Sequence, residues 1–249
     1  LLSQAPGYRV YGSKERPKVK LSQLKYGGVI CRLGSIARKV NDAGSVYELA
    51  LATIEAGLNL QEMVEKRGLG DQVDLLALAA AGRLDCPVRH PDPAHLYLTG
   101  TGLTHLGSAS ARDAMHASTA GLSDSMKMFR MGIEGGKPAP GQTGVQPEWF
   151  YKGTGVAAVA PGDPLVAPHF ALDGSEEPEI AGAYVIGPDG TPYRIGFALA
   201  NEFSDHVTER VNYLYLAHSK LRPASFGPEI LLGDLPRDVR GMSRILRNG

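Results

Sequence analysis

The sequence lacks the cysteines that a disulfide-stabilised domain would need. Its 249 residues include only Cys31 and Cys86, and no two cysteines have the C-x-x-C spacing of a zinc or redox motif. The seven histidines show no zinc-ligand spacing either. These absences exclude a disulfide framework and favour a reducing compartment, so we expect a cytoplasmic protein.

The sequence also lacks an excess of charge and any long apolar run. Lys and Arg number 26 and so do Asp and Glu, which gives a formal net charge of +0. That balance argues against whole-chain electrostatic binding to nucleic acid or to a membrane surface. No apolar run approaches the roughly 18 residues of a membrane span. We therefore expect neither nucleic acid nor membrane as a partner.

Two common enzyme motifs are missing as well. Gly100-Thr101-Gly102 follows a strand-like run, but a dinucleotide fingerprint would require a third glycine where His105 stands. The G-x-S-x-G elbow of α/β-hydrolases does not occur. A nucleotide-binding or α/β-hydrolase function is thus disfavoured.

Glycine and proline are plentiful, and their distribution predicts many turns and a sheet-rich body. Strand-like runs alternate with turn signals through the second half of the chain. The predicted fold class is α+β, mainly β. The runs are Glu148–Lys152, Val156–Val159, Ile180–Ile186, Tyr193–Leu199 and Glu229–Leu232.

The chain divides into three predicted parts. Residues 1–44 are locally basic and are expected to be a flexible arm, with one short strand near 27–33. Residues 45–94 are expected to form a small helical region and a proline-rich linker, and residues 95–249 the domain that carries the chemistry. Capping signals at Ser45 and Asn59 mark two helices, and a third is expected over Leu75–Ala81.

Two further helices are expected beyond the linker. One spans Ser108–His116, and the other spans Ser123–Arg130. Three apolar side chains at helical spacing on or just after the second are predicted to be core residues: Met126, Phe129 and Ile133.

Three glutamates are brought together by a predicted hairpin around Gly187-Pro188-Asp189-Gly190. Pairing symmetric about this loop puts Glu177 opposite Ala200, with Glu202 one diagonal step further along. Because strand side chains alternate, Glu177, Glu179 and Glu202 then project from the same face. Diagonal neighbours lie about 7–8 Å apart, within reach of a shared ion.

Converging carboxylates repel one another unless a positive group joins them. A hard divalent cation with oxygen ligands is the natural partner, so we predict a site for Mg²⁺, with Mn²⁺ or Ca²⁺ as alternatives. The competing interpretation is a solvated acidic sheet edge without a ligand.

The glutamates belong to an ordered set of segments within residues 95–235. These are Gly102–Arg112, Glu148–Gly155, Glu177-Pro178-Glu179, Gly196–Asp205 and Lys220–Pro228. As a set they resemble the fumarylacetoacetate hydrolase superfamily, and within it the lyases that act on 2-keto-3-deoxy-pentonates. The resemblance implies a mixed-sheet β-roll with a metal held by Glu177, Glu179 and Glu202. Many members have aspartate at the third position, so Glu202 is a departure.

The resemblance also implies other site residues. Lys220 matches a lysine beside the metal and is the candidate base or enolate partner, while Ser225 matches a small-residue turn there. Lys152 matches a lysine near the substrate. Hydrolytic members carry a water-activating histidine at the position of Ser108. Lyase-like members resemble the Ser-x-x-x-Arg pattern formed here with Arg112, so these two residues would hold or protonate the polar end of the substrate.

The implied function is metal-dependent dehydration of a 2-keto-3-deoxy sugar acid, such as 2-keto-3-deoxy-L-arabonate. A hydrolase cleaving a carbon–carbon bond of a 2,4-diketo acid is an alternative, with His105 activating water. A non-catalytic sugar-acid-binding module is a second alternative. The partner is a small 2-keto acid, and family members usually form homodimers, which is an analogy.

Both ends of the chain differ from the family pattern. Residues 1–44 lack the usual opening strands. The last residues, Arg244–Gly249, resemble the first strand of a hairpin whose return strand is missing. We therefore expect the catalytic domain to be C-terminally incomplete, with doubtful activity as an isolated polypeptide.

Overall fold

The computed structural model describes residues 18–103, 110, 123–136, 138–145, 148–236 and 238–248. The first strands and helices are β1 (Val19–Gln23), β2 (Val29–Leu33), β3 (Ile36–Val40), α1 (Val46–Glu55), α2 (Leu60–Arg67), β4 (Leu69–Val73) and α3 (Leu75–Ala80). They are followed by β5 (Tyr97–Gly102), α5 (Asp124–Gly135), β6 (Glu148–Thr154) and β7 (Ala158–Val159). The last are β8 (Pro178–Ile186), β9 (Pro192–Asn201), α6 (His206–Val211), α7 (Leu216–Lys220), β10 (Ala224–Phe226) and β11 (Ile230–Leu231).

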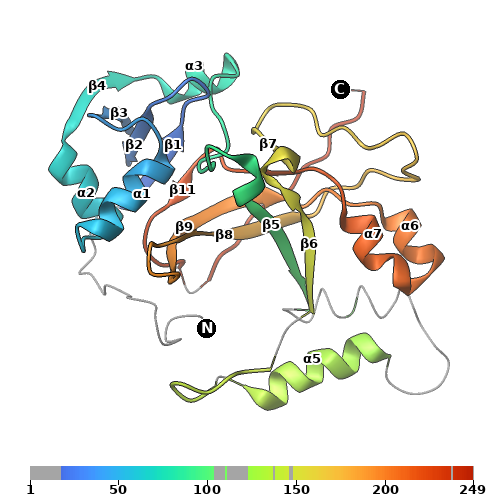
Figure 1. Cartoon of the computed structure of the whole chain (residues 1–249). Helices are drawn as coiled ribbons and strands as arrows, with labels where there is room; N and C mark the ends of the chain where they lie inside the picture. Colours follow the sequence, from blue (N-terminus) through green and yellow to red (C-terminus); the bar gives the residue numbers. More distant parts are fainter. Residues whose placement is uncertain are drawn as a thin grey trace.

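One large sheet contains most of the strands (Figure 1). Its order is β4-β3-β2-β1-β11-β9-β10-β7, and β8 pairs with β9. A second sheet consists of β5 and β6 alone. Strand β9 is the centre of the arrangement, because it pairs with β8 as well as with both β10 and β11. The mainly β, α+β prediction is confirmed.

Residues 19–40 form three strands, so the predicted flexible arm is wrong for this part of the chain. Strands β1, β2 and β3 pair antiparallel, and β1 also pairs with β11. Val19 and Leu21 point inward and are buried, while Lys18 and Lys20 take the outward positions. The basic residues thus mark the outer face of a strand, and the expectation that opening strands are absent is also wrong.

The sheet continues across the predicted boundary at Ala94, since β1 precedes that position and β11 follows it. The division into domains remains a prediction. None of the described helices has the length and apolar character that a bilayer crossing demands.

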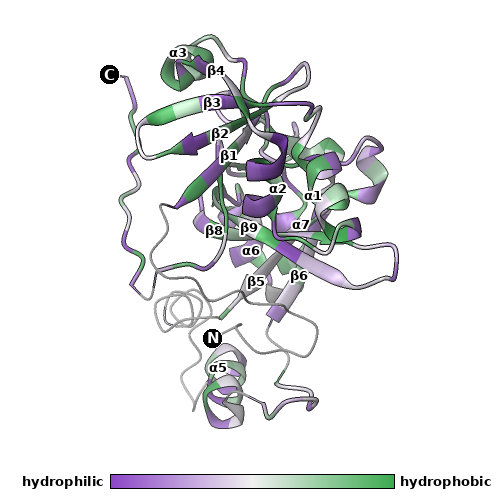
Figure 2. Ribbon diagram, turned by 90° about the vertical axis from the view of Figure 1, so that its left-hand side faces the viewer, coloured by the Kyte–Doolittle hydropathy of each residue, from purple (hydrophilic) through white to green (hydrophobic). Residues whose placement is uncertain are grey.

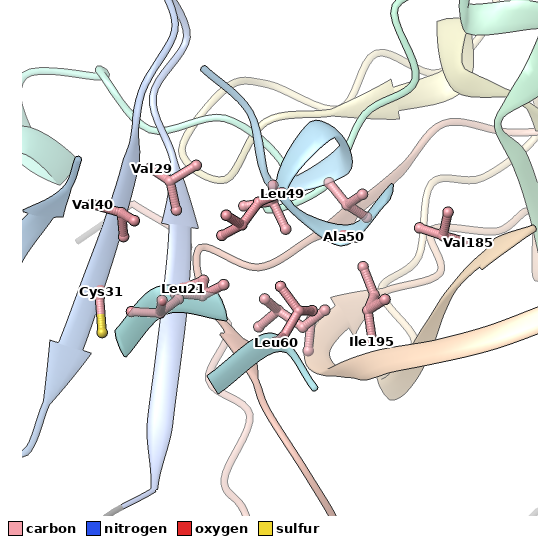
Figure 3. Close-up of a cluster of buried hydrophobic side chains, with 14 of the residues drawn as sticks. Leu21, Val29, Cys31, Val40, Leu49, Ala50, Leu60, Val185 and Ile195 are labelled. Atoms are coloured by element: carbon pink, nitrogen blue, oxygen red, sulfur yellow. The ribbon is translucent and has the colours of Figure 1, made fainter. Parts of the chain in front are cut away.

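The core lies between the large sheet and helices α1 and α2 (Figure 3). Leu21, Leu49 and Ile230 are almost completely buried there. Cys31 and Cys86 are free thiols within the same cluster. Burial raises the pKa of both to about 11. Their chemistry is therefore that of small apolar side chains.

Helices α1 and α2 begin at the predicted capping residues, Ser45 and Asn59, and α3 begins after Asp74, which the sequence analysis did not single out. At α2 the Asn59 side chain accepts from the Glu62 N–H, and the Glu62 carboxylate accepts from the Asn59 N–H. Such reciprocal bonds satisfy two amide groups that the helix leaves without partners. At α1 the Ser45 side chain accepts a hydrogen bond from the Glu48 N–H, and at α3 the Asp74 side chain accepts one from the Ala77 N–H.

Replacing Asn59 by alanine is expected to lower the free energy of unfolding by about 1 kcal/mol, because both reciprocal bonds depend on its geometry. Urea denaturation measures the change. Gln61→Ala on the exposed side of the same helix is the control, with an expected effect within about 0.5 kcal/mol. Equal effects of the two substitutions would contradict the capping argument.

Helix α5 and the last residues differ from the predictions. No described residue of α5 is buried, and Ile133 is 63% exposed, so the expected core role of Met126, Phe129 and Ile133 is wrong. The reason is that α5 lies apart from both sheets (Figures 1 and 2). Residues 238–248 form neither helix nor strand, so the strand expected over Arg244–Gly249 is absent from the described part.

Candidate metal centre

The β8–β9 hairpin carries the three predicted carboxylates, but its register differs from the prediction by two residues. Glu179 pairs with Ala200, and the Glu202 N–H donates to the Glu177 carbonyl at 2.9 Å. The connecting turn runs from Gly187 to Thr191, where the Gly187 N–H bonds to the Thr191 carbonyl. This turn is one residue longer than the predicted four-residue loop and accounts for one residue of the shift. A bulge further along accounts for the other, because Ile195 has no partner on β8. A shift of two leaves every side chain on its predicted face.

The three side chains therefore converge. One carboxylate oxygen from each of Glu177, Glu179 and Glu202 lies within 4.8 Å of the others. Glu179 is exposed, whereas the side chain of Glu202 is only 11% exposed. Oxygen ligands in this number and spacing suit a hard divalent cation.

The chain on either side of the carboxylates is fixed by side-chain bonds. Asn201 accepts hydrogen bonds at its Oδ1 from the N–H groups of Glu177 and Phe203, both at 3.1 Å. Two residues beyond Glu177 and Glu202, Ser175 and Ser204 bond to each other through their main chains. These contacts hold the end of β9 against the start of β8, so the carboxylates are positioned by the backbone.

Glu177 is held by two cationic groups. Its Oε1 accepts from Lys220 Nζ and from His206 Nε2, each at 2.5 Å. Burial alone would raise the pKa of Glu177, but the hydrogen bonds and charges of His206 and Lys220 outweigh it and lower this pKa to about 2. The hydrogen bond to Glu177 in turn raises the pKa of His206. Glu177 is therefore the firmly ionised member of the group.

Glu202 has the opposite character. Its Oε1 is buried without a hydrogen-bond partner, and Lys220 Nζ and Lys152 Nζ lie 3.7 and 3.9 Å away. Burial raises the pKa of Glu202 to about 7, against the attraction of Lys220 and together with the repulsion of Glu177. A buried carboxylate oxygen without a partner is costly, and a bound cation would satisfy it. The donor set therefore fits a divalent metal ion.

Lys220 lies between the carboxylates at the end of α7. Its side chain is 3% exposed and its Nζ is 5.3 Å from the centre of the Phe150 ring, a cation–π contact. Ser204 Oγ is 3.3 Å from the same nitrogen. The only amine that touches the Glu177 carboxylate among the described residues thus lies between β6, α7 and the segment that follows β9.

Comparison with known proteins gives matches among solved structures only. No protein-family model and no curated protein matches the chain. The apo form and a hexagonal crystal form of 2-keto-3-deoxy-D-arabinonate dehydratase each superimpose with a TM-score of 0.56, and the complex of that enzyme with magnesium and 2,5-dioxopentanoate with 0.54. Each is 19% identical over 90% of this chain and 68% of the neighbour.

The chain has the 2-keto-3-deoxy-D-arabinonate dehydratase fold. The shared fold agrees with the predicted mainly β architecture with a mixed sheet. Glu177 immediately precedes β8 and Glu202 immediately follows β9. That end of the hairpin lies beside α6 and α7 (Figure 1).

The fold brings together only part of the predicted site. Glu177, Glu179, Glu202, Lys152 and Lys220 lie in one cluster. Ser225 in β10 pairs with Asn201, the residue before Glu202. His105, Ser108 and Arg112, with the helix expected over 108–116, lie outside the described residues, and their roles stay predictions.

Sequence reasoning missed a second group of residues behind the carboxylates. His206 contacts Glu177, and the neighbouring Asp205 forms a fully buried ion pair with Arg222 at 3.0 Å. Asp205 also caps α6 through Thr208. The available signal was an aspartate at a capping position shortly after Glu202, but the partner on the far side of α7 has no sequence signature.

Gly100, which belongs to the weak dinucleotide motif, has a packing reason for lacking a side chain. A Cβ there would lie 2.3 Å from the Phe150 ring and 3.0 Å from Glu202 Oε2. Strand β5 can therefore lie against the carboxylate cluster only with glycine at this position.

Replacing Gly100 by alanine is expected to cost about 1–3 kcal/mol of unfolding free energy, because Phe150 or Glu202 must move to make room. Gly132→Ala is a matched control in α5, where no atom lies within 4 Å of the added Cβ, and it should be neutral or slightly stabilising. Thermal unfolding of both variants measures this. A Gly100→Ala variant as stable as Gly132→Ala would contradict the close approach.

Proposed function

We propose that this protein is a metal-dependent hydro-lyase that dehydrates a 2-keto-3-deoxy sugar acid. The observation that supports the proposal best is the group of three carboxylates beside a buried lysine, in which the Glu202 Oε1 has no hydrogen-bond partner. The fold is shared with a dehydratase whose structure was solved with magnesium and 2,5-dioxopentanoate. The reaction and the substrate class for this chain rest on that combination.

Glu177, Glu179 and Glu202 would hold the ion, and Mg²⁺ is the proposed species. When bound, such a cation would grip the carboxylate and ketone oxygens of a 2-keto acid and act as a Lewis acid towards the ketone. His206 would keep the Glu177 carboxylate oriented through its 2.5 Å hydrogen bond.

Lys220 is proposed as the base that removes a proton from C3. A lysine removes a proton only in its neutral form, and Lys220 Nζ here donates a hydrogen bond to Glu177. The proposed role therefore requires the amine to give up that proton before the C3–H bond breaks. As the C3–H bond breaks, its electron pair forms a C3–C4 double bond and the C4–O bond breaks. The leaving hydroxyl takes a proton and departs as water. What remains is a 3,4-unsaturated 2-keto acid with its alcohol at C5. Transfer of a proton from C5 to C3 moves the double bond to C4–C5, and the resulting enol becomes the aldehyde, so the net change is the loss of one water.

The substrate must be protonated and held at its far end during this elimination. Ser108 and Arg112 are proposed for that role, as the sequence predicts. Association of two copies and a cytoplasmic location also stay predictions.

The test is an assay of 2-keto-3-deoxy-pentonates with Mg²⁺, followed by mass spectrometry. A product lighter by one water is expected, with none formed by a Glu179→Gln variant. Glu179 is chosen because it is exposed, so its amide should leave the fold intact. A 2,4-diketo acid is assayed in parallel, and its conversion to pyruvate and a second acid would instead indicate the hydrolase alternative. Ligand binding without turnover would indicate a binding module, and both results would overturn the proposal.

A metal titration tests the site itself. Mg²⁺ at about 100 times its dissociation constant should stabilise the fold by about 2.7 kcal/mol, which corresponds to a rise of at least about 5 °C in melting temperature. Glu179→Gln should lose most of that shift. No shift in the unaltered protein would count against a metal at this cluster.

A further inference from the structure

Lys152 is buried beneath the carboxylates rather than open to a substrate. Its side chain is 2% exposed, and its Nζ donates to three main-chain carbonyls. They belong to Glu202 and Phe203, each at 3.0 Å, and to Lys220, at 2.9 Å. An ammonium group has three N–H donors, so all of them are occupied.

The three carbonyls come from two separate segments. Glu202 and Phe203 follow β9, whereas Lys220 ends α7. A single ammonium therefore joins the segment of the proposed metal ligand to that of the proposed base. Its charge also lies 3.9 Å from the Glu202 Oε1, which has no hydrogen-bond partner.

Strand β6 makes a second contact with the same lysine of α7. Phe150 and Lys152 are two residues apart, so they project from one face of β6, and both are buried. The Phe150 ring faces Lys220 Nζ at 5.3 Å, while Lys152 bonds to the Lys220 carbonyl. Lys220 is thus fixed by β6 at both its side chain and its main chain.

We infer that Lys152 is a positioning residue that sets the distance between the Glu202 carboxylate and the Lys220 amine. The inference rests on the proposed function, which gives those two groups their roles. It replaces the sequence-based interpretation of Lys152 as a substrate-binding residue, since a substrate contact would require one of the three carbonyl bonds to break.

The chemistry requires lysine in particular. Methionine has a similar length but no donor, so it would leave three carbonyls without their bonds. Arginine keeps the charge, but its planar fork is larger and cannot direct donors at three carbonyls around one point. Lys152→Arg is therefore expected to weaken Mg²⁺ binding and loosen the two segments much as Lys152→Met does.

The first test compares Mg²⁺ affinity in folded variants. Lys152→Met is expected to weaken Mg²⁺ binding by about 10–100-fold, the usual effect of removing a group that orients metal ligands. This loss of orientation is expected to outweigh the removal of a positive charge 3.9 Å from Glu202 Oε1. Leu21→Ala is a control of reduced stability, because Leu21 is fully buried in the core near β2 and α1 and touches none of the three carbonyls. At a temperature where both variants are folded, the control should bind Mg²⁺ as the unaltered protein does. Equal affinity in Lys152→Met and Leu21→Ala would overturn the inference.

A second measurement does not depend on the metal. Amide hydrogen exchange should become faster in Lys152→Met around Glu202–Asp205 and Lys220–Arg222, relative to Leu21→Ala. Unchanged exchange in these two segments would overturn the inference even if the unaltered protein binds Mg²⁺. Conversely, an unaltered protein that binds no Mg²⁺ would refute the proposed function, while faster exchange would still establish Lys152 as the group that joins the two segments.

Discussion

Replacing Asp205 by alanine is expected to lower the free energy of unfolding by about 3–5 kcal/mol, because it leaves the guanidinium of Arg222 buried without its counter-charge. The side chains of Asp205 and Arg222 are 0% and 1% exposed. Asp205 also accepts hydrogen bonds from the Leu172 N–H and from the N–H and hydroxyl of Thr208. A loss of this size is a large share of the stability of an ordinary domain.

Urea denaturation of the Asp205→Ala variant measures the effect. The control is Asp163→Ala, which breaks the ion pair with Lys25 at the surface and should cost at most about 1 kcal/mol. Similar losses of unfolding free energy in the two variants would contradict the argument that burial makes the Asp205–Arg222 pair more important to stability than the Asp163–Lys25 pair.

Acid titration gives the same pair a second signature. Burial alone would raise the pKa of Asp205, but hydrogen bonds from Thr208, Leu172 and Arg222 hold it well below its usual range. A carboxyl with a depressed folded-state pKa stabilises the protein above its unfolded-state pKa, near 4, and this stabilisation is lost as the pH falls below that value. The fall in stability between about pH 4 and lower values should therefore be shallower in Asp205→Asn than in the unaltered protein.

The second large effect is expected at Lys220. Replacing it by methionine should lower kcat at least about 100-fold, because general acid–base groups contribute roughly 10²–10⁴-fold to a rate. Mg²⁺ binding should persist, since the substitution removes a cation that lies 2.5 Å from Glu177 Oε1 and would compete with the metal. The apolar side chain can also pack on the Phe150 ring, which favours retention of the fold.

Steady-state kinetics and Mg²⁺ titration, carried out on the same preparation, separate the two effects. Lys127→Met is the control, because this lysine lies exposed on α5 and pairs only with Asp124 among the described residues. Turnover of Lys220→Met within about tenfold of the unaltered protein would exclude Lys220 as the base. Loss of Mg²⁺ binding would instead assign it to holding the carboxylates.

The carboxylate cluster was predictable because it depends only on whether the register shift is even or odd. Glu177, Glu179 and Glu202 share a face in the predicted register and in any register shifted from it by two residues. The actual hairpin differs by two, through a five-residue turn and the bulge at Ile195, and the cluster survives. Local turn chemistry and strand alternation were sufficient here.

Other parts depended on contacts that local patterns do not encode. Strand β1 has alternating Val19 and Leu21, but the adjacent lysines suggested a solvated arm. In α5 the helix itself was predictable, whereas the expected burial of Ile133 failed because the helix has no sheet to pack on. The pairing of Asp205 with Arg222 and the three carbonyl bonds of Lys152 join segments distant in sequence, and only the folded chain reveals them.

The bulge at Ile195 has a consequence for how this hairpin tolerates changes in length. Residues added at the tip, between Gly187 and Thr191, lie beyond the paired strands and only enlarge the turn. Deleting Ile195 would instead shift the pairing of all later β9 residues by one position. Because side chains alternate between the two faces of a strand, Glu202 would then lie on the opposite face of the sheet from Glu177. The same hairpin is thus open to length variation at its outer end, while one residue within β9 keeps the acidic trio together.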